Sequence, residues 1–545
     1  MKYRNTILAI AAVCTLSSCA KWLSEDGPMT NRVEDYFTNG KAAEQVVNAA
    51  YVPLMWEYNS TYFSEFFIGD VMSDDALKGG QNIGDMSDVY DLENFRAISN
   101  NGLVLQYYRA QFQGVARANL ALEQVAGMET DAENFTEELK TRFLAEAHFL
   151  RALYYFRLVR LFGGVPLSES PIYSTSGWKV PRSSVDDVYE LIVSDLEDAQ
   201  KGLPLKSRYD DADLGRATRG AAQAMLLKAY LYWGDYKRNN GQDATGTYRD
   251  AETWGSRFLE DNATEYDLCQ DYADNFTLEG ENGPESVFEV QYMAEGTSDY
   301  GEGNGFSRGT FATVLLRSRS SAFGNPGWGF CHPTQNLYDE YEEGDTRRDA
   351  CILVPSESQV INEAEEIYLG NKYLCRKRTI MNGGSYVKLD HDSRSPANRI
   401  EIRLADVYLM YAESCLRNGN TSEAKIYLEK VRSRARGSKS VLPEFPGYSV
   451  PDYTASYAPK ALSDTPEDLE LAIRHERRCE LAMESHRWYD LCRWGIAKEV
   501  MDAYLASETD LARNEMRPFV KGKHELLPIP DEEVRLGSLD QNPNW

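Results

Sequence analysis

The run TRFLAEAHFLRALYYFRLVRLFGGVPL, residues 141–167, decides the fold class. Its apolar side chains recur at steps of three and four residues, the spacing of one face of an α-helix. The stripe consists of Phe143, Ala147, Leu150, Tyr154, Leu158 and Leu161, and Phe156, Val159 and Phe162 widen it. A helix that is apolar around most of its circumference is largely buried. Gly163, Gly164 and Pro166 then stop the helix, so we expect a mostly α-helical protein with this segment in its core.

Helical periodicity recurs on both sides of this run. It is found in residues 40–58, 103–125, 184–201, 215–236, 402–435 and 472–501. The segments 142–201, 219–258 and 404–434 each read as a pair of helices with the spacing of a degenerate tetratricopeptide hairpin. Such a hairpin buries its apolar face only by stacking on its neighbours, so the pairs predict a stacked helical scaffold.

The middle of the chain changes in character. Residues 262–400 are rich in Gly, Asn, Pro, Ser and aromatic residues, with strand-like runs at 286–293 and 312–318. Residues 66–88 are polar and rich in Gly and Asp, which predicts an irregular loop. The predicted organisation is one body, 41–545, with a helical scaffold at 41–261 and 401–505, a loop-rich region at 262–400 and an irregular C-terminal segment at 506–545.

The first residues have the layout of an export signal. Lys2 and Arg4 form a basic start, and the apolar run 7–16 is too short to span a bilayer. The tetrapeptide LSSC, residues 16–19, resembles the lipobox of bacterial lipoproteins, in which the cysteine is acylated. An ordinary secretory signal is the alternative. The prediction is a signal peptide over 1–18, lipidation of Cys19, and a lipid anchor and tether over 19–40.

Composition excludes several classes of protein. The chain has 545 residues, of which 85 are acidic and 58 basic, for a net charge of −27. A surface this acidic repels phosphate backbones, so nucleic acid is not an expected partner. Seven cysteines follow Cys19 with no C-x-x-C, which is unlike a zinc framework. Some disulfides are compatible with an exported protein, but the spacing assigns none.

Each candidate catalytic or cofactor motif in the sequence lacks a residue that the motif requires. His475 and Glu476 do not begin an H-E-x-x-H motif, because residue 479 is a cysteine. The run 301–306 lacks the third glycine of a dinucleotide loop, and 210–215 lacks the downstream glutamate of a calcium loop. With 85 acidic residues, carboxylate pairs arise by chance, and no pair is selected for hydrolysis. We expect no enzyme activity, no cofactor and no bound metal, and a glycoside hydrolase is the less favoured alternative.

A few loop residues are candidates for binding a ligand. Trp328 lies among Gly and Pro residues, where it serves either as an anchor for its own loop or as an exposed stacking platform. Tyr300 has the same two interpretations. Asp74 and Asp75 lie in the irregular segment, where exposed carboxylates can accept hydrogen bonds from sugar hydroxyls. The alternative for both is a solvated loop charge without a role in binding.

Taken in order, several stretches resemble the SusD/RagB family of outer-membrane glycan-binding lipoproteins. The matching stretches are LSSC (16–19), EAHFLRALYYFRLVRLFGGVPL (146–167), GRATRGAAQAMLLKAYLYWGDY (215–236), GWGFCHPTQNLYDEYEEGDTRRD (327–349), IRLADVYLMYAESCLRNGNTSEA (402–424), ERRCELAMESHRWYDLCRWG (476–495) and LLPIPDEEVRLGSLDQNPNW (526–545). They span nearly all of the chain after Cys19. The resemblance implies a SusD-like fold with about four tetratricopeptide-like helical hairpins plus an irregular loop-rich region with short strands.

The resemblance also implies a function. Residues 262–400 and the loops of 56–110 would carry the ligand surface, with Tyr62 or Tyr90 in place of the early loop aromatics of starch-binding relatives. The partner would be a SusC-like TonB-dependent β-barrel transporter, and the protein would be lipid-anchored in the outer membrane, facing outward. We therefore predict non-catalytic binding of an oligosaccharide or polysaccharide and its delivery to that transporter. The alternative is a peptide- or protein-binding member of the same family.

Overall fold

The fold is described by a computed structural model. The described residues are 37–57, 64–131, 133–174, 179–294, 308–356, 359, 372–437, 442–508 and 514–545. Tyr62, Tyr300 and Cys19 lie outside them, so the predictions for these three residues remain predictions. Among the described residues, no helix combines the length and the apolar character that crossing a membrane requires.

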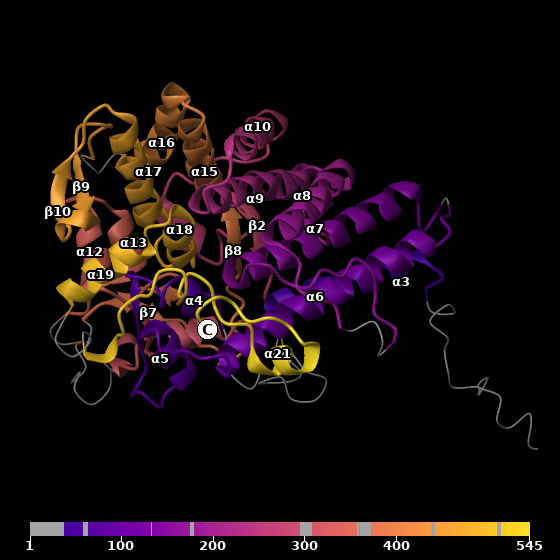
Figure 1. The fold of residues 1–545 in the computed structure, drawn as a ribbon, viewed down its shortest axis with the longest axis horizontal. Helices are drawn as coiled ribbons and strands as arrows, with labels where there is room; N and C mark the ends of the chain where they lie inside the picture. Colours follow the sequence, from indigo (N-terminus) through magenta and orange to yellow (C-terminus); the bar gives the residue numbers. More distant parts are fainter. Residues whose placement is uncertain are drawn as a thin grey trace, which may run out of the picture.

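Helices dominate the structure, as the sequence predicts (Figure 1). The longer ones are α3 (Gly40–Tyr51), α6 (Gly102–Gly127), α7 (Glu137–Phe162), α8 (Val185–Gly202), α9 (Arg219–Asn239), α10 (Thr245–Asp261), α15 (Leu404–Arg417), α16 (Thr421–Arg436), α17 (Pro466–Leu481), α18 (Arg487–Trp494) and α19 (Ala497–Ser507). From α6 to α10 each helix packs against the next, α10 packs against α15, and α15 packs against α16 and α17. The predicted pairs correspond to α7 with α8, α9 with α10, and α15 with α16.

Helix α7 forms the centre of this stack, and its C-terminal end and its buried side chains are those that its sequence predicts. Thr136 caps its first turn by accepting a hydrogen bond from the Leu139 amide, and Gly163, at φ +69°, ends it. Both Tyr154 and Leu150 are fully buried. Helix α6 approaches closely because Gly114 faces the Tyr154 ring, where a Cβ atom would lie 2.4 Å from the ring carbons. Burial of each large apolar side chain contributes about 1.5–3 kcal/mol, so α7 anchors the core.

The strands form two-stranded antiparallel ribbons. Strand β1 (Ala76–Gly79) pairs with β3 (Phe330–Pro333), and β2 (Ser286–Val290) pairs with β8 (Arg399–Arg403). Three smaller ribbons join β4 (Ile352–Leu353) to β5 (Leu374–Cys375), β6 (Met381–Asn382) to β7 (Ser385–Tyr386), and β9 (Ser449–Asp452) to β10 (Ala458–Ala461). The β1–β3 ribbon joins parts of the chain that are far apart in sequence, and it positions the candidate site described below.

Two local predictions are wrong. Residues 66–88 are not one continuous irregular loop, because they contain most of α4 (Glu65–Gly69), β1 and the start of α5 (Ser87–Glu93). Residues 70–75 and 80–86, between these elements, are irregular as predicted. The polar composition of 66–88 hides a buried segment whose carboxylates are paired with distant arginines. The run 312–318 is not a strand but contains the short helix α11 (Ala312–Leu316). A short apolar run without alternation does not distinguish a strand from a buried helix.

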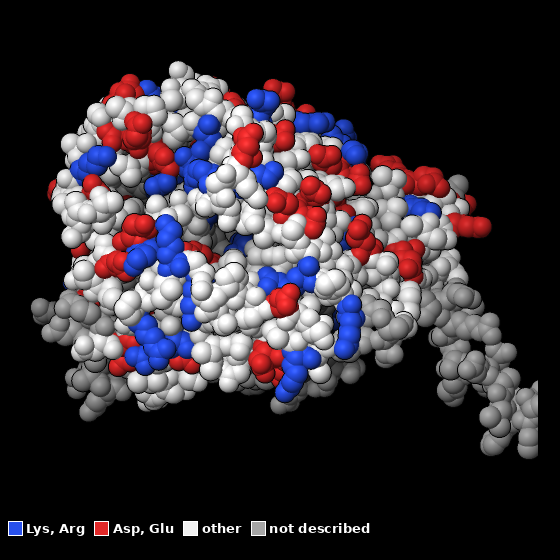
Figure 2. Space-filling view, in the orientation of Figure 1, with Lys and Arg blue, Asp and Glu red and all other residues white. Residues whose placement is uncertain are grey.

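The C-terminal segment is mostly irregular, as predicted, apart from the short helix α21 (Asp531–Gly537). Figure 2 shows acidic and basic side chains intermixed over the visible face, without a continuous basic patch. A hollow opens near the centre of this face, close to where α9 and α18 meet in Figure 1 (Figures 1 and 2).

Candidate functional site

The two predicted ligand aspartates are buried. Asp74 and Asp75 have 0% exposed surface. Arg487 donates to both oxygens of Asp74 at 2.8 and 2.9 Å, and Arg478 donates to Asp75 at 2.8 Å. The expectation that these carboxylates are exposed is therefore wrong, and so is the alternative of solvated loop charges. Both serve as internal counter-ions, and neither is offered to a ligand at the surface.

Tyr90 is also buried, with 6% of its surface exposed. Its hydroxyl donates a hydrogen bond to the Glu515 carboxylate, and the Arg96 guanidinium lies 5.6 Å from its ring centroid. Burial and the Glu515 carboxylate raise the pKa of Tyr90 to about 12. Its ring packs within the protein, which does not fit the predicted stacking on a sugar.

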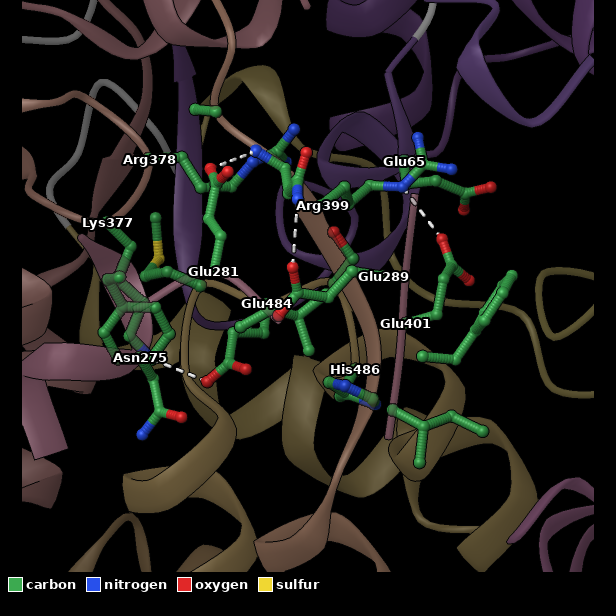
Figure 3. A pocket seen from close by; sticks show the side chains of 18 of the residues that line it. Glu65, Asn275, Glu281, Glu289, Lys377, Arg378, Arg399, Glu401, Glu484 and His486 are labelled. Atoms are coloured by element: carbon green, nitrogen blue, oxygen red, sulfur yellow. Dashed lines mark hydrogen bonds and ion pairs between the residues drawn. The ribbon is translucent and has the colours of Figure 1, made fainter. Parts of the chain in front are cut away.

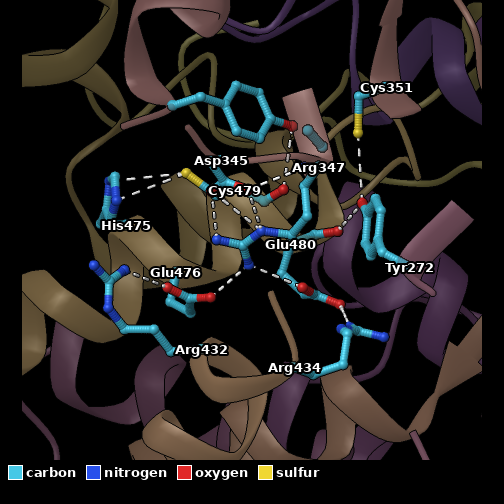
Figure 4. Close-up of polar contacts among 12 residues, drawn as sticks. Tyr272, Asp345, Arg347, Cys351, Arg432, Arg434, His475, Glu476, Cys479 and Glu480 are labelled. Atoms are coloured by element: carbon cyan, nitrogen blue, oxygen red, sulfur yellow. Dashed lines mark hydrogen bonds and ion pairs between the residues drawn. The ribbon is translucent and has the colours of Figure 1, made fainter. Parts of the chain in front are cut away.

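The charges of α17 form a structural network (Figure 4). Arg347, from α13 (Arg347–Cys351), donates to Glu476 at 2.5 Å and to Glu480 at 2.9 Å. Arg432 of α16 donates to the other oxygen of Glu476 at 3.1 Å. These side chains are all buried, so the network fixes α17 against its neighbours and leaves no group facing solvent.

Glu340, His475 and Cys479 each place one potential metal-ligand atom within 4.8 Å of the others. The His475 Nδ1 atom lies 2.7 Å from Glu340, whose second oxygen accepts a hydrogen bond from Arg478 at 2.7 Å. Burial alone lowers the pKa of His475, but Cys479 and the adjacent glutamates raise it well above the usual range. The imidazole thus lies between the carboxylates of Glu340 and Glu342, 2.7 and 3.4 Å from its two ring nitrogens.

Trp328 lies where the β1–β3 ribbon ends. The Gly80 amide donates to the Gly329 carbonyl at 2.6 Å, which brings residues 80–86 beside the tryptophan loop. Glycine is required at this crossing because Gly79 has φ +70°, and a Cβ atom there would lie 2.3 Å from the Gly329 oxygen. The ribbon therefore places Trp328 next to a loop that is 240 or more residues earlier in the sequence.

The Trp328 side chain is half-buried and held in place. Its ring meets the Phe311 ring edge-on, with centroids 4.9 Å apart. Its backbone amide donates to the Val314 carbonyl at 2.9 Å, which fixes the loop on α11. The indole thus anchors its loop through one edge and keeps part of its surface accessible, which combines the two interpretations offered by the sequence.

Polar residues lie on the loop that runs beside the Trp328 backbone. Gln81 and Asn82 are exposed, and Asp85 is half-buried. The Lys78 ammonium fastens their loop from inside by donating to the Asn82 carbonyl at 3.0 Å and to the Asp85 carbonyl at 2.6 Å. Burial lowers the pKa of Lys78 to about 8. The loop therefore presents amide and carboxylate side chains on a rigid base.

Arg319 lies between Trp328 and Asp85. Its guanidinium donates to the Trp328 carbonyl at 3.0 Å and lies 3.9 Å from the Asp85 carboxylate. We call the surface formed by Gln81, Asn82, Asp85, Arg319 and Trp328 the Trp328 face. It combines an aromatic ring with donors and acceptors, which is a suitable arrangement for stacking on a sugar ring and binding its hydroxyls.

The ends of two further segments converge near this face. The Thr310 hydroxyl donates to the Glu57 carboxylate, and Thr310 directly precedes Phe311. The Met293 amide donates to the Arg308 carbonyl at 2.8 Å. Residues 57 and 64 flank the segment with Tyr62, and residues 294 and 308 flank the segment with Tyr300. Of the six predicted binding residues, only Trp328 has a described position on this face.

Sequence reasoning missed Gln81, Asn82, Asp85 and Arg319. A usable signal was the Gly79-Gly80 pair, because adjacent glycines mark a close backbone approach between strands. The pairing partner, however, lies about 250 residues away, and one sequence does not reveal it.

The protein also contains an internal cavity, and none of the residues that line it belongs to the Trp328 face. This central cavity, of about 70 Å³, is bounded by α4, α7, α9, β2, β8 and residues 483–486 (Figure 3). Ligand pockets for drug-sized molecules measure about 300–1,000 Å³, so the cavity is too small for an oligosaccharide. Most of its charges are paired: Arg157 donates to Glu401 at 2.6 Å, and Arg399 donates to Glu401 at 2.8 Å.

Comparisons with known proteins now identify the family. A family model described as "SusD family" matches residues 357–545, and one described as "Starch-binding associating with outer membrane" matches residues 24–231. SusD-like protein P2 of Formosa agariphila is 25% identical, and the alignment covers 100% of each chain.

Solved structures agree with this match. Surface glycan-binding protein A from Bacteroides fluxus is 27% identical with a TM-score of 0.76, covering 93% of this chain and 100% of its own. A laminarin binding SusD-like protein is 28% identical with a TM-score of 0.73 and has the same coverage. The two family models together match more than half of the residues, and the helical fold superposes over nearly the whole chain. The chain belongs to the SusD/RagB family.

Proposed function

We propose that this protein binds a carbohydrate without altering it, and that the Trp328 face is the binding surface. The proposal rests mainly on the half-buried Trp328 side chain, which packs edge-on against Phe311. The polar loop 81–85 begins directly after Gly80, whose amide donates to the Gly329 carbonyl. The relatives support this class of ligand, because two of the matched structures are described as glycan-binding and laminarin-binding proteins.

The chemistry of the face suits a neutral sugar. An aromatic ring presents its face to the C–H groups of a pyranose, and Asn82, Gln81 and Asp85 offer acceptors and donors to its hydroxyls. The Arg319 charge lies close to the Asp85 charge, so the two offset each other locally. A single stacking platform with a few exposed hydrogen bonds gives modest affinity, roughly micromolar or weaker.

Lipid anchoring and delivery complete the proposal. Acylation at Cys19 would hold the protein in the outer membrane, facing outward, and the bound glycan would pass to a TonB-dependent transporter. The lipobox-like sequence at 16–19 and the family description "associating with outer membrane" support this location. Modest affinity is compatible with transfer, because a ligand must dissociate before a pore can take it up.

Affinity electrophoresis against a panel of polysaccharides that includes a β-1,3-glucan and starch tests the proposal. We expect one neutral polysaccharide to retard the protein, and Trp328→Ala to abolish this retardation. Trp254→Ala is the matched control, because Trp254 is also half-buried but lies on α10. The proposal fails if Trp328→Ala binds as tightly as the parent, or if peptides and no glycan raise the melting temperature.

A further inference from the structure

The central cavity contains hydrogen-bond donors that lack acceptors. The Arg160 Nε atom is buried and has no hydrogen-bond partner among the described residues. Its closest carboxylate is Glu65, 3.6 Å from the guanidinium. Arg157 likewise has an Nε atom without a partner in the described part of the chain. Buried N–H groups are almost always paired, so these atoms call for an acceptor that the protein does not supply.

Two more side chains on the same cavity wall, Lys228 and His486, can form further hydrogen bonds. The Lys228 ammonium has three protons and donates to Asp406 at 3.1 Å, and Asp406 also accepts from Arg477 at 2.8 Å. His486 borders the cavity and is 8% exposed (Figure 3). Within the described residues, neither of its ring nitrogens has a hydrogen-bond partner.

Arg160, Lys228 and His486 line the same cavity. Burial lowers the pKa of Lys228, and repulsion from Arg160 and Arg477 lowers it further. Burial and the Lys228 charge lower the pKa of His486 to about 4. At neutral pH the imidazole is therefore uncharged and carries one N–H group, while the Arg160 guanidinium supplies positive charge to the same cavity.

A water molecule that accepts from one of these donors brings two protons that need acceptors of their own. The carboxylates at the cavity already accept hydrogen bonds from the protein; they are Glu65, Glu281, Glu289, Glu401, Glu484 and the adjacent Asp406. A small anion only accepts hydrogen bonds, and it offsets the charge of buried cations. A volume of about 70 Å³ admits a monatomic anion and excludes a sugar.

We propose that the central cavity binds one small monovalent anion of the halide class between Arg160, Lys228 and His486. The anion completes the hydrogen bonding of the cavity wall and stabilises the junction of α7, α9 and the segment before α18. The site shares no residue with the Trp328 face, so the anion proposal can be tested independently of glycan binding.

Thermal unfolding of the purified full chain is the first test. At constant ionic strength, replacing gluconate by bromide or chloride is expected to raise the melting temperature in a saturable manner, because the anion binds only the folded state. Arg160→Met keeps the aliphatic stem and removes the donors, so this response is expected to disappear. Lys201→Met is the control, because Lys201 is exposed on α8 and its removal leaves the response unchanged.

Should Arg160→Met fail to fold, His486→Phe removes only the ring nitrogens and is expected to weaken the halide response. Crystals grown in bromide give a direct readout, with an anomalous peak expected among the three side chains. Water alone in the cavity, without an anomalous peak, would overturn the proposal. An equal halide response in the parent and in both cavity variants would overturn it as well.

Discussion

Asp74 and Asp75 illustrate how single residues escape prediction. Each is an acid in a polar, glycine-containing stretch, and both are completely buried because Arg478 and Arg487 reach them from 403 and 413 residues away. A buried charge is tolerated when it is paired and hydrogen-bonded, so the distant arginines decide the location of these aspartates. Local composition carries no information about such partners.

Asp70, in the same stretch, differs from these two aspartates in its hydrogen bonding and its protonation. It is 1% exposed, one oxygen accepts a hydrogen bond from the Ser485 amide, and the other has no partner among the described residues. Burial, and then the nearby Asp75 charge, raise the pKa of Asp70 to about 8. The folded protein thus keeps a proton on Asp70 that the unfolded chain releases near pH 4.

This difference predicts a pH dependence of stability. The pKa of Asp70 is higher in the folded protein than in the unfolded chain. The contribution of Asp70 to the free energy of unfolding is therefore complete below about pH 4 and is lost as the pH rises towards about 8. Asp70→Asn keeps an acceptor for Ser485 and cannot ionise, so its melting temperature should gain on the parent between pH 5 and 8, by at least a few degrees. Thermal scans across this range measure the gain. Asp198→Asn, at an exposed position on α8, should show no such trend, and parallel pH profiles for Asp70→Asn and the parent would contradict the prediction.

At the scale of elements, α17 shows how charge fixes a helix in place. Arg478 alone contacts Asp75, Glu340 and Asp74 at 2.8, 2.7 and 2.9 Å. It therefore ties α17 to the segment before β1 and to α12 (Gln335–Glu340). Figure 4 shows the neighbouring part of this network, in which Arg347 joins two acids of α17.

Removing Arg478 should be costly. Arg478→Met leaves three buried carboxylates short of a partner, which predicts a loss of about 3–5 kcal/mol in the free energy of unfolding. Arg257→Met is a suitable comparison, because its ion pair with Asp261 is exposed and should contribute at most about 1 kcal/mol. Denaturant titration followed by circular dichroism measures both. Equal effects of the two substitutions would show that the buried network is not stabilising.

At the scale of the whole molecule, some features were predictable and others were not. The apolar period of α7 and the stop signal at Gly163 specify a buried helix locally, and the structure confirms them. The pairing of β1 with β3 depends on contacts between residues 76–79 and 330–333, which no local pattern encodes. For this reason the loop context alone selects Trp328 as a candidate, whereas Gln81 and Asn82, on a loop about 250 residues earlier, are not selected.

The net charge of −27 also acts at this scale. Charges spread over the surface create a long-range field that repels a polyanion before any contact forms, and salt screens it with a Debye length of about 10 Å at 0.1 M. The proposed binding face adds no net charge of its own, because Arg319 lies beside Asp85. The field of the whole protein should therefore discriminate between neutral and anionic glycans that share one backbone.

We predict that carboxymethylation of the preferred neutral glycan weakens binding several-fold at low ionic strength, and that added salt narrows this difference. Binding of the unmodified glycan should be nearly independent of salt, because stacking and hydroxyl hydrogen bonds involve no net charge. Calorimetric titrations of both ligands at about 20 mM and about 500 mM salt separate the two contributions, since the Debye length falls several-fold over that range. A difference that persists at high salt would indicate a steric clash at the Trp328 face, and tighter binding of the anionic glycan would contradict the electrostatic argument.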